Sequence, residues 1–135
     1  MDGEGDDVEV EPTSRAFPLA ENDMTIKVQD LIKDAAKKGF LKKGANEATK
    51  ALNRGIAQII VMAADTEPLE IVLHLPLLCE DKNVPYIFVP SQHSLGAAWG
   101  VSRNIISWAI ISDGNESDLQ TRINELKDEI EQLFL

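Results

Sequence analysis

The sequence predicts a single-domain α/β protein, a three-layer α/β/α sandwich with a mixed central sheet. Two observations carry this prediction. Amphipathic segments with helical spacing alternate with short runs of β-branched and aromatic residues, and one of these runs is apolar almost without interruption. A strand of that kind is typical of the centre of a sheet that is covered on both faces. We therefore expect helices on both sides of one sheet.

The chain has 135 residues, enough for one domain with a core of its own, and 44% of them are hydrophobic. Residues 1–16 are acidic, contain glycine and proline and have almost no apolar periodicity. We expect them to form a disordered tail, because such a segment buries too little apolar surface to fold. The folded domain is then expected at residues 17–135.

Two helices are predicted ahead of the central strand. The first starts at Thr25 and is stopped by Gly39. Its apolar residues recur at helical spacing: Ile26, Val28, Leu31, Ile32, Ala35 and Ala36. Residues 40–43 are expected to form a short connection, and the second helix follows Gly44 and ends at Gly55.

The second half of the domain continues the alternation after the central strand at 56–64. Asp65 or Thr66 is expected to cap a helix that runs from about Pro68 to Glu80, with a kink or a break at Pro76. Further strands are predicted at 86–89 and 105–111, with a helix at 91–98 between them. A capping box of Ser117 and Gln120 opens the last helix, whose apolar ladder should pack on the sheet: Leu119, Ile123, Leu126, Ile130 and Leu133.

The net charge of −10 argues at first against a nucleic-acid partner, but the charge is unevenly distributed. Residues 1–24 carry −7 and residues 112–135 carry −5, which leaves +2 for the middle of the chain. Residues 27–54 hold eight basic and three acidic residues. An acidic molecule with one basic side favours selective binding of RNA or DNA, although an ordinary solvated helix face is the alternative.

The helix after Gly44 carries the polar residues best suited to nucleic acid. Asn46, Lys50 and Arg54 follow one another at a spacing of four, and Glu47 lies one residue round the helix. Asparagine and glutamate offer hydrogen bonds to base edges, and the cations and the first helical amides suit phosphate. The structural alternatives are a helix cap at Asn46 and an ordinary ion pair between Glu47 and Lys50.

Little in the sequence supports catalysis. His74 lies between two leucines, which favours a structural histidine, and Cys79 follows two leucines, which favours a buried inert thiol. The acidic residues lack metal-ligand spacings, and no Walker-type phosphate loop is present. We therefore expect no enzyme activity, no metal and no cofactor. The single cysteine suggests a reducing compartment, and without a secretory or membrane-spanning stretch we expect a soluble intracellular protein.

Four segments carry a resemblance to a known family: Gly44–Lys50, Ile60–Asp65, Glu67–Ile71 and His74–Tyr86. They are similar to the kink-turn RNA-binding family of ribosomal and spliceosomal proteins, nearest to its spliceosomal and nucleolar branch. The similarity extends from about Phe17 to the C-terminus. It implies a non-catalytic protein, monomeric outside its particle, that binds kink-turns of U4 small nuclear RNA and box C/D small nucleolar RNAs. It also implies assembly proteins as partners, a nuclear and nucleolar location and no membrane partner.

The resemblance further implies a site with two parts. The helix that begins at Gly44 would lie against tandem sheared G·A pairs, with guanine edges bound by Asn46, Glu47 and Lys50 and the backbone supported by Arg54. An extruded nucleotide would occupy a pocket made of Glu67, Ile71, Arg103 and Ile106. Relatives carry a lysine where this chain has Gln92 and arginines where it has Pro90 and Ala97. Trp99 and Asn104 also depart from the family pattern. We expect weaker binding and a shallower salt dependence, since three positive charges are missing.

Other functions stay open at this point. A ribosomal subunit or an H/ACA pseudouridylation subunit could use the same scaffold, although residues 100–103 favour the spliceosomal branch. From other classes, the chain could be an adaptor whose basic side binds acidic proteins, or an enzyme that uses Cys79.

Overall fold

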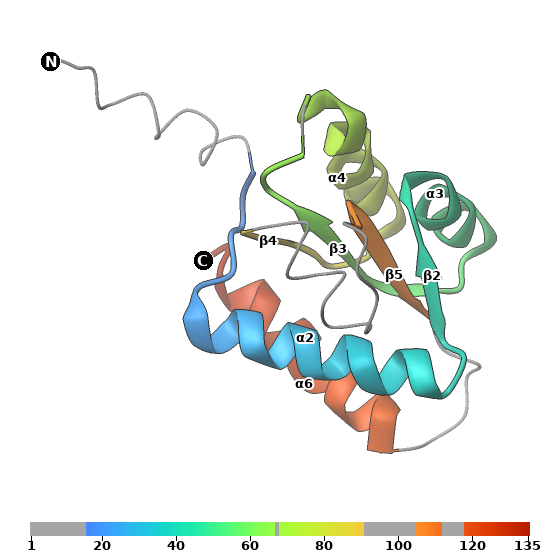
Figure 1. The fold of residues 1–135 in the computed structure, drawn as a ribbon, viewed down its shortest axis with the longest axis vertical. Helices are drawn as coiled ribbons and strands as arrows, with labels where there is room; N and C mark the ends of the chain where they lie inside the picture. The colour runs from blue at the N-terminus through green and yellow to red at the C-terminus, as the bar shows by residue number, and fades with distance from the viewer. Residues whose placement is uncertain (1–15, 67, 91–104, 112–117) are drawn as a thin grey trace, which may run out of the picture.

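The computed structural model describes residues 16–66, 68–90, 105–111 and 118–135, and it confirms the α/β/α sandwich (Figure 1). The elements in these residues are α2 (Asn22–Lys37), β2 (Leu41–Lys43), α3 (Ala45–Arg54), β3 (Ala57–Ala63), α4 (Glu70–Lys82), β4 (Tyr86–Val89), β5 (Ser107–Ile111) and α6 (Asp118–Gln132). No helix in the described ranges is long and apolar enough to cross a membrane.

The four strands form one mixed sheet in the order β2-β5-β3-β4. β3 pairs with β4 in parallel and with β5 antiparallel, and β5 pairs antiparallel with β2. The apolar run therefore lies in the interior of the sheet, as predicted. Its one partly exposed position is Gln58, whose side-chain oxygen accepts a hydrogen bond of 2.7 Å from Lys127 of α6. Beyond β4, Leu19 forms an isolated parallel bridge with Phe88.

The helices cover both faces of the sheet, with α2 and α6 on one side and α3 and α4 on the other (Figure 1). Successive residues of β5 show the division, because Trp108 packs with α2 and α6 whereas Ala109 packs with α3 and α4. Both side chains are buried. Successive side chains of a strand point to opposite faces of the sheet, so each helical layer packs on a core of its own.

Two predictions in the first half of the domain need correction. Residues 41–43 form the strand β2 and are not a mere connection, because Leu41 pairs with Ile110 and Lys43 with Trp108. A three-residue segment with two lysines shows no strand periodicity of its own, so only its neighbour β5 defines it. α2 begins at Asn22, three residues before the predicted start. Ile26 lies outside its buried face, with 56% of its surface exposed.

The helix after the central strand also differs from the prediction. α4 runs from Glu70 to Lys82 with Pro76 inside it and is not divided. Buried residues on either side of the proline, Leu75 and Cys79, anchor both halves in the same core. The predicted caps are wrong, because the N-cap is Leu69 without a side-chain hydrogen bond. The Thr66 hydroxyl instead donates to the Ala63 carbonyl at 2.7 Å.

The last helix packs on the sheet as predicted, with Leu119, Ile123, Leu126 and Ile130 buried. Leu133 lies beyond the end of α6 and is 39% exposed. Ser117 and the predicted helix at 91–98 lie outside the described residues. The boundary of the acidic tail stays a prediction, although Ala16, which we assigned to the tail, is buried among core residues.

Candidate nucleic-acid interface

The helix α3 starts at a glycine whose backbone conformation few other residues can adopt. Gly44 is the N-cap, with φ 94° and ψ 155°. This region of dihedral space is essentially restricted to glycine. The Gly44 N–H donates to the Ser107 carbonyl at 2.9 Å, which ties the helix start to β5. A Cβ at Gly44 would meet no described atom within 4 Å, so the dihedral, and not crowding inside the protein, requires glycine here.

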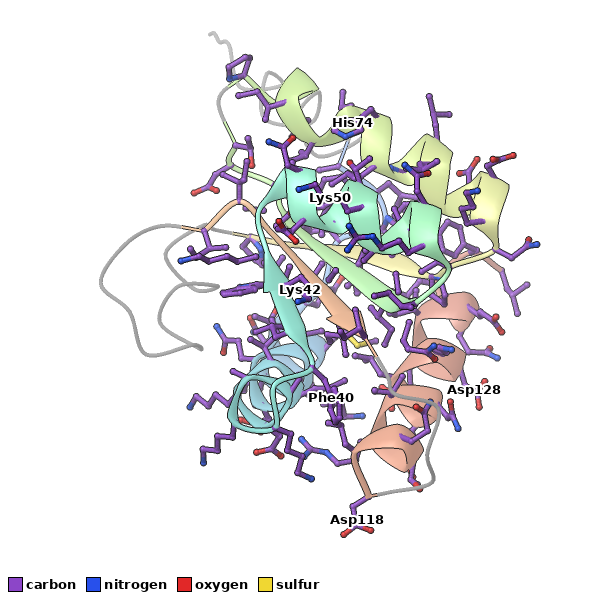
Figure 2. The ribbon with its side chains drawn as sticks, turned by 90° about the vertical axis from the view of Figure 1, so that its right-hand side faces the viewer. Phe40, Lys42, Lys50, His74, Asp118 and Asp128 are labelled. Carbon is purple, nitrogen blue, oxygen red and sulfur yellow. The ribbon has the colours of Figure 1, made fainter. Side chains whose placement is uncertain are left out.

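α3 separates a buried small-residue side from an exposed polar side. Ala48, Ala51 and Leu52 are buried against the sheet, and the helix ends at Gly55 in a left-handed conformation. The opposite side carries the predicted binding residues, of which Asn46, Lys50 and Arg54 are exposed and Glu47 is half-buried. Lys50 can be followed in Figure 2. The predicted exposed sector is therefore present, and no cap hydrogen bond from a side chain is found at the start of α3.

An ion pair within α3 joins the two charged residues of this sector. Lys50 Nζ lies 3.6 Å from Glu47 Oε2, with the side chains 56% and 44% exposed. The ion pair that we gave as the structural alternative for Glu47 and Lys50 is thus present in the structure. A pair this exposed contributes less than about 1 kcal/mol, so a ligand can separate it at little cost. Both side chains remain available for binding.

The other predicted part of the site is only partly described. Ile71 lies in the first turn of α4 and is 44% exposed. Ile106, just before β5, is half-buried on the α3 and α4 side, and its carbonyl accepts from the Ala63 N–H at 2.9 Å. Glu67, Gln92 and Arg103 lie outside the described residues, as do Ala97, Trp99 and Asn104, so their roles stay predictions; Pro90 is exposed directly after β4.

Backbone hydrogen bonds bring the ends of three elements together at one edge of the sheet, the edge at which β3 ends and β5 begins. The start of α3 bonds to Ser107, and the end of β3 bonds to the neighbouring Ile106. Lys43, the last residue of β2, directly precedes this junction. Through β5, the start of α3 and the end of β3 therefore lie close to each other.

Two residues next to this edge were not recognised from the sequence as a pair. His74 on α4 is exposed, and its Nε2 lies 3.2 Å from the Thr49 hydroxyl on α3. This bond agrees with the prediction of a structural histidine, although the side chain is exposed. Thr49 follows Ala45 by four residues, a spacing at which a threonine hydroxyl can bond the earlier carbonyl. Nothing in the sequence places His74 beside it.

The structure gives no support to a cysteine-based enzyme. Cys79 is fully buried, and burial, with a smaller contribution from the charge of Glu80, raises the pKa of its thiol to about 12. The thiol therefore stays protonated near neutral pH and is a poor nucleophile. Within the described residues, no group of three or more His, Cys, Asp or Glu side chains could hold a metal ion.

The fold is thus a small α/β/α domain with an exposed polar sector on α3. Residues 26–120 match the sequence profile of the Ribosomal protein L7Ae/L30e/S12e/Gadd45 family. This chain belongs to that family.

Similar proteins are named for ribonucleoproteins. The chain is 57% identical over 125 residues to a "13 kDa ribonucleoprotein-associated protein" of Yarrowia lipolytica, covering 93% of this chain and 98% of the relative. It is 56% identical over 121 residues to the "Small nuclear ribonucleoprotein associated homolog 13" of Caenorhabditis elegans, covering 90% and 94%. The solved "Giardia lamblia 15.5kD RNA binding protein" superimposes with a TM-score of 0.83 at 42% identity, covering 88% of this chain and 97% of that one.

These relatives confirm the resemblance inferred from the sequence. Their names describe association with ribonucleoproteins and binding of RNA, and none of them describes an enzyme. The coarser part of the prediction, an RNA-binding ribonucleoprotein protein of this family, is thus confirmed.

Proposed function

We propose that this protein binds kink-turn RNA and thereby starts the assembly of ribonucleoprotein particles. Its RNAs would be U4 small nuclear RNA, for pre-mRNA splicing, and box C/D small nucleolar RNAs, for ribosomal RNA processing and 2′-O-methylation. The observation that carries the proposal is the exposed polar sector of α3, which begins at Gly44 next to open space. The names of the similar proteins support a partner of this class.

The chemistry of the α3 sector matches the edges of sheared G·A pairs. The Glu47 carboxylate can accept hydrogen bonds from the imino and amino groups of guanine, which a cation cannot do. Asn46 offers both a donor and an acceptor. Lys50 can donate to guanine acceptors or phosphate, and Arg54, one turn further along, supplies charge to the backbone. A negatively charged residue in a basic RNA-binding surface therefore has a specific purpose.

The second part of the proposed site holds the nucleotide that a kink-turn expels from its stack. Ile71 supplies exposed apolar surface, and Ile106 lies at the junction of α3, β3 and β5. Glu67 and Arg103 would add polar contacts to the edges of the base, as is usual for recognition of an unstacked nucleotide. Gln92 would contribute less charge than the lysine of relatives.

Binding to both parts would select one RNA conformation. A kink-turn exchanges between extended and bent forms, and a ligand that contacts only the bent form shifts the population towards it. The bent RNA and the protein then form a composite surface for later proteins. We propose that the protein acts in this way as a monomer in the nucleus and nucleolus, with proteins of the U4/U6.U5 tri-snRNP and the box C/D particles as partners.

Replacement of Lys50 by alanine tests the proposal. We expect Lys50→Ala to weaken binding of a kink-turn RNA by about 10- to 100-fold, as for loss of a good base contact, while the melting temperature stays unchanged. Lys33→Ala is the matched control, because Lys33 is an exposed lysine on α2 in the opposite layer. Gel-shift titrations should use the kink-turn and the same RNA with Watson–Crick pairs in place of the G·A pairs.

Three results would contradict the proposal. They are equal affinity of the wild-type protein for the two RNAs, equal losses for the two lysine variants, and unchanged affinity of Lys50→Ala. Binding of acidic proteins that resists nuclease would favour the adaptor alternative.

A further inference from the structure

Two consecutive hydrogen bonds connect α4 to the first turn of α3. His74 Nε2 lies 3.2 Å from Thr49 Oγ1, and Thr49 Oγ1 donates to the Ala45 carbonyl oxygen at 2.9 Å. We call these two bonds the His74 relay. In Figure 2, His74 lies beside the helix that carries Lys50, and the relay joins the two helices of one layer.

The direction of the first bond follows from the number of hydrogens. A threonine hydroxyl has a single hydrogen, and Thr49 donates it to Ala45. His74 Nε2 must therefore carry a hydrogen and donate it to the Thr49 oxygen. The Nε2–H tautomer of the imidazole has this hydrogen.

The relay acts on the turn that carries the proposed guanine contacts. Ala45 is the first residue of α3 and directly precedes Asn46 and Glu47. At its other end, His74 follows Ile71 by three residues, a spacing that places both on one side of α4. The relay therefore connects the α3 part of the site with the α4 part.

The buried side of α3 does little to fix the rotation of the helix about its axis. Its buried side chains are two alanines and one leucine, Ala48, Ala51 and Leu52. Alanines allow a close approach to the sheet but make few interlocking contacts that would fix the rotation of the helix about its axis. Hydrogen bonds are directional, so a bond between α4 and α3 restrains that rotation.

We propose that Thr49 and His74 are positioning residues, which hold the first turn of α3 in one orientation relative to α4. In this orientation the G·A contacts and the pocket for the extruded nucleotide fit one RNA at the same time. The inference rests on the proposed function and concerns how the two parts of its site cooperate. The two residues act through the position of α3 and not by touching RNA.

Four single variants and one double variant test the relay. Thr49→Val removes the hydroxyl with little change of shape, and His74→Met removes the donor; each should weaken kink-turn binding by about 3- to 10-fold, the range for one hydrogen bond. Thr49→Ser and His74→Gln keep a hydroxyl and an N–H donor and should bind within about twofold of the wild type. The double variant Thr49→Val/His74→Met should bind as well as either single variant. Each single change already removes the interaction between the two residues, so the two losses should not add.

A second RNA separates positioning from general destabilisation. The same kink-turn with an abasic site at the extruded position leaves the pocket empty, so α3 no longer has to be aligned with α4. The losses caused by Thr49→Val and His74→Met should then shrink to about twofold or less. Thermal melting of each variant confirms that the protein is folded at the assay temperature.

The relay is refuted by unchanged affinity of both variants, by additive losses in the double variant, or by equal losses on the kink-turn and its abasic form. These failures differ from failure of the proposed function. If Lys50→Ala binds normally, the α3 site itself is wrong. If Lys50→Ala weakens binding but Thr49→Val and His74→Met do not, only the relay is wrong.

Discussion

The two helical layers of this domain use their charged residues in different ways. Between α2 and α6, charges pair across the layer: Lys27 Nζ lies 2.9 Å from Glu129, and Arg122 pairs with Asp34. On α3, the pair of Lys50 with Glu47 stays within one helix and faces outward. The first arrangement joins elements distant in sequence, whereas the second leaves both partners accessible.

From this difference and the proposed function, we expect stability and binding to depend on opposite sides of one sheet. Changes in the α2 and α6 layer should alter the free energy of unfolding and leave RNA affinity intact. Changes on the outer side of α3 should do the reverse. Changes at the start of α3 should alter both stability and RNA affinity, because Gly44 is bonded to β5 and also begins the polar sector.

The largest effect on folding is expected from the core of the α2 and α6 layer. Ile123→Ala deletes a fully buried side chain and should lower the free energy of unfolding by about 2–5 kcal/mol. Chemical denaturation measures this change, and RNA titration of the folded protein should give an unchanged affinity. Ile26→Ala is the matched control, because this isoleucine is 56% exposed on α2 and should cost far less. A comparable loss of RNA affinity in Ile123→Ala would break the division between the layers.

A substitution at the start of α3 should affect both properties. Gly44→Ala forces alanine into a glycine-only conformation, at a cost of about 1–3 kcal/mol in stability. RNA affinity should fall as well, because relief of the strain moves the first turn of α3. Gly39→Ala is the matched control: its φ is 80° and its added Cβ also meets open space, but it follows α2. If both variants lose RNA affinity equally, Gly44 has no special place in the site.

The smallest effect is expected from an exposed pair that joins α2 to α6. The hydrogen bond from Arg122, helped by nearby positive charges, lowers the pKa of Asp34. A carboxylate with a lowered pKa stabilises the fold above its unfolded pKa of about 3.9 and loses this contribution as the pH falls through the folded value. Asp34→Asn should therefore cost less than about 1 kcal/mol at pH 7, and this cost should shrink as the pH falls below the unfolded pKa of about 3.9. A cost that does not depend on pH would exclude the ionised pair as its cause.

Much of the fold could be predicted because its signals are local. The apolar run of β3 and the glycine-bounded helix α3 are each visible in one stretch of sequence, and both were found where predicted. β2 could not be predicted, because three residues become a strand only by pairing with β5. The continuity of α4 through Pro76 likewise depends on the core beneath it.

The candidate site was predicted in two different ways. The exposed sector of α3 follows from helical spacing, and the structure confirms its exposure. The pocket residues Ile71 and Ile106 came from family resemblance, since no periodicity connects residues so far apart. The bond between Thr49 and His74 was missed because the two residues are 25 positions apart in the chain. Their helices meet only in the folded protein.

The affinity of Glu47→Gln for a kink-turn RNA tests the central claim most directly. This change removes a negative charge from a surface that would face phosphate and frees Lys50 from its ion pair. Simple charge attraction therefore predicts tighter binding. If Glu47 accepts hydrogen bonds from guanine, the amide replaces one carboxylate oxygen by a donor, and binding should weaken about 10-fold or more. Tighter or unchanged binding would contradict the proposed contact between α3 and the G·A pairs.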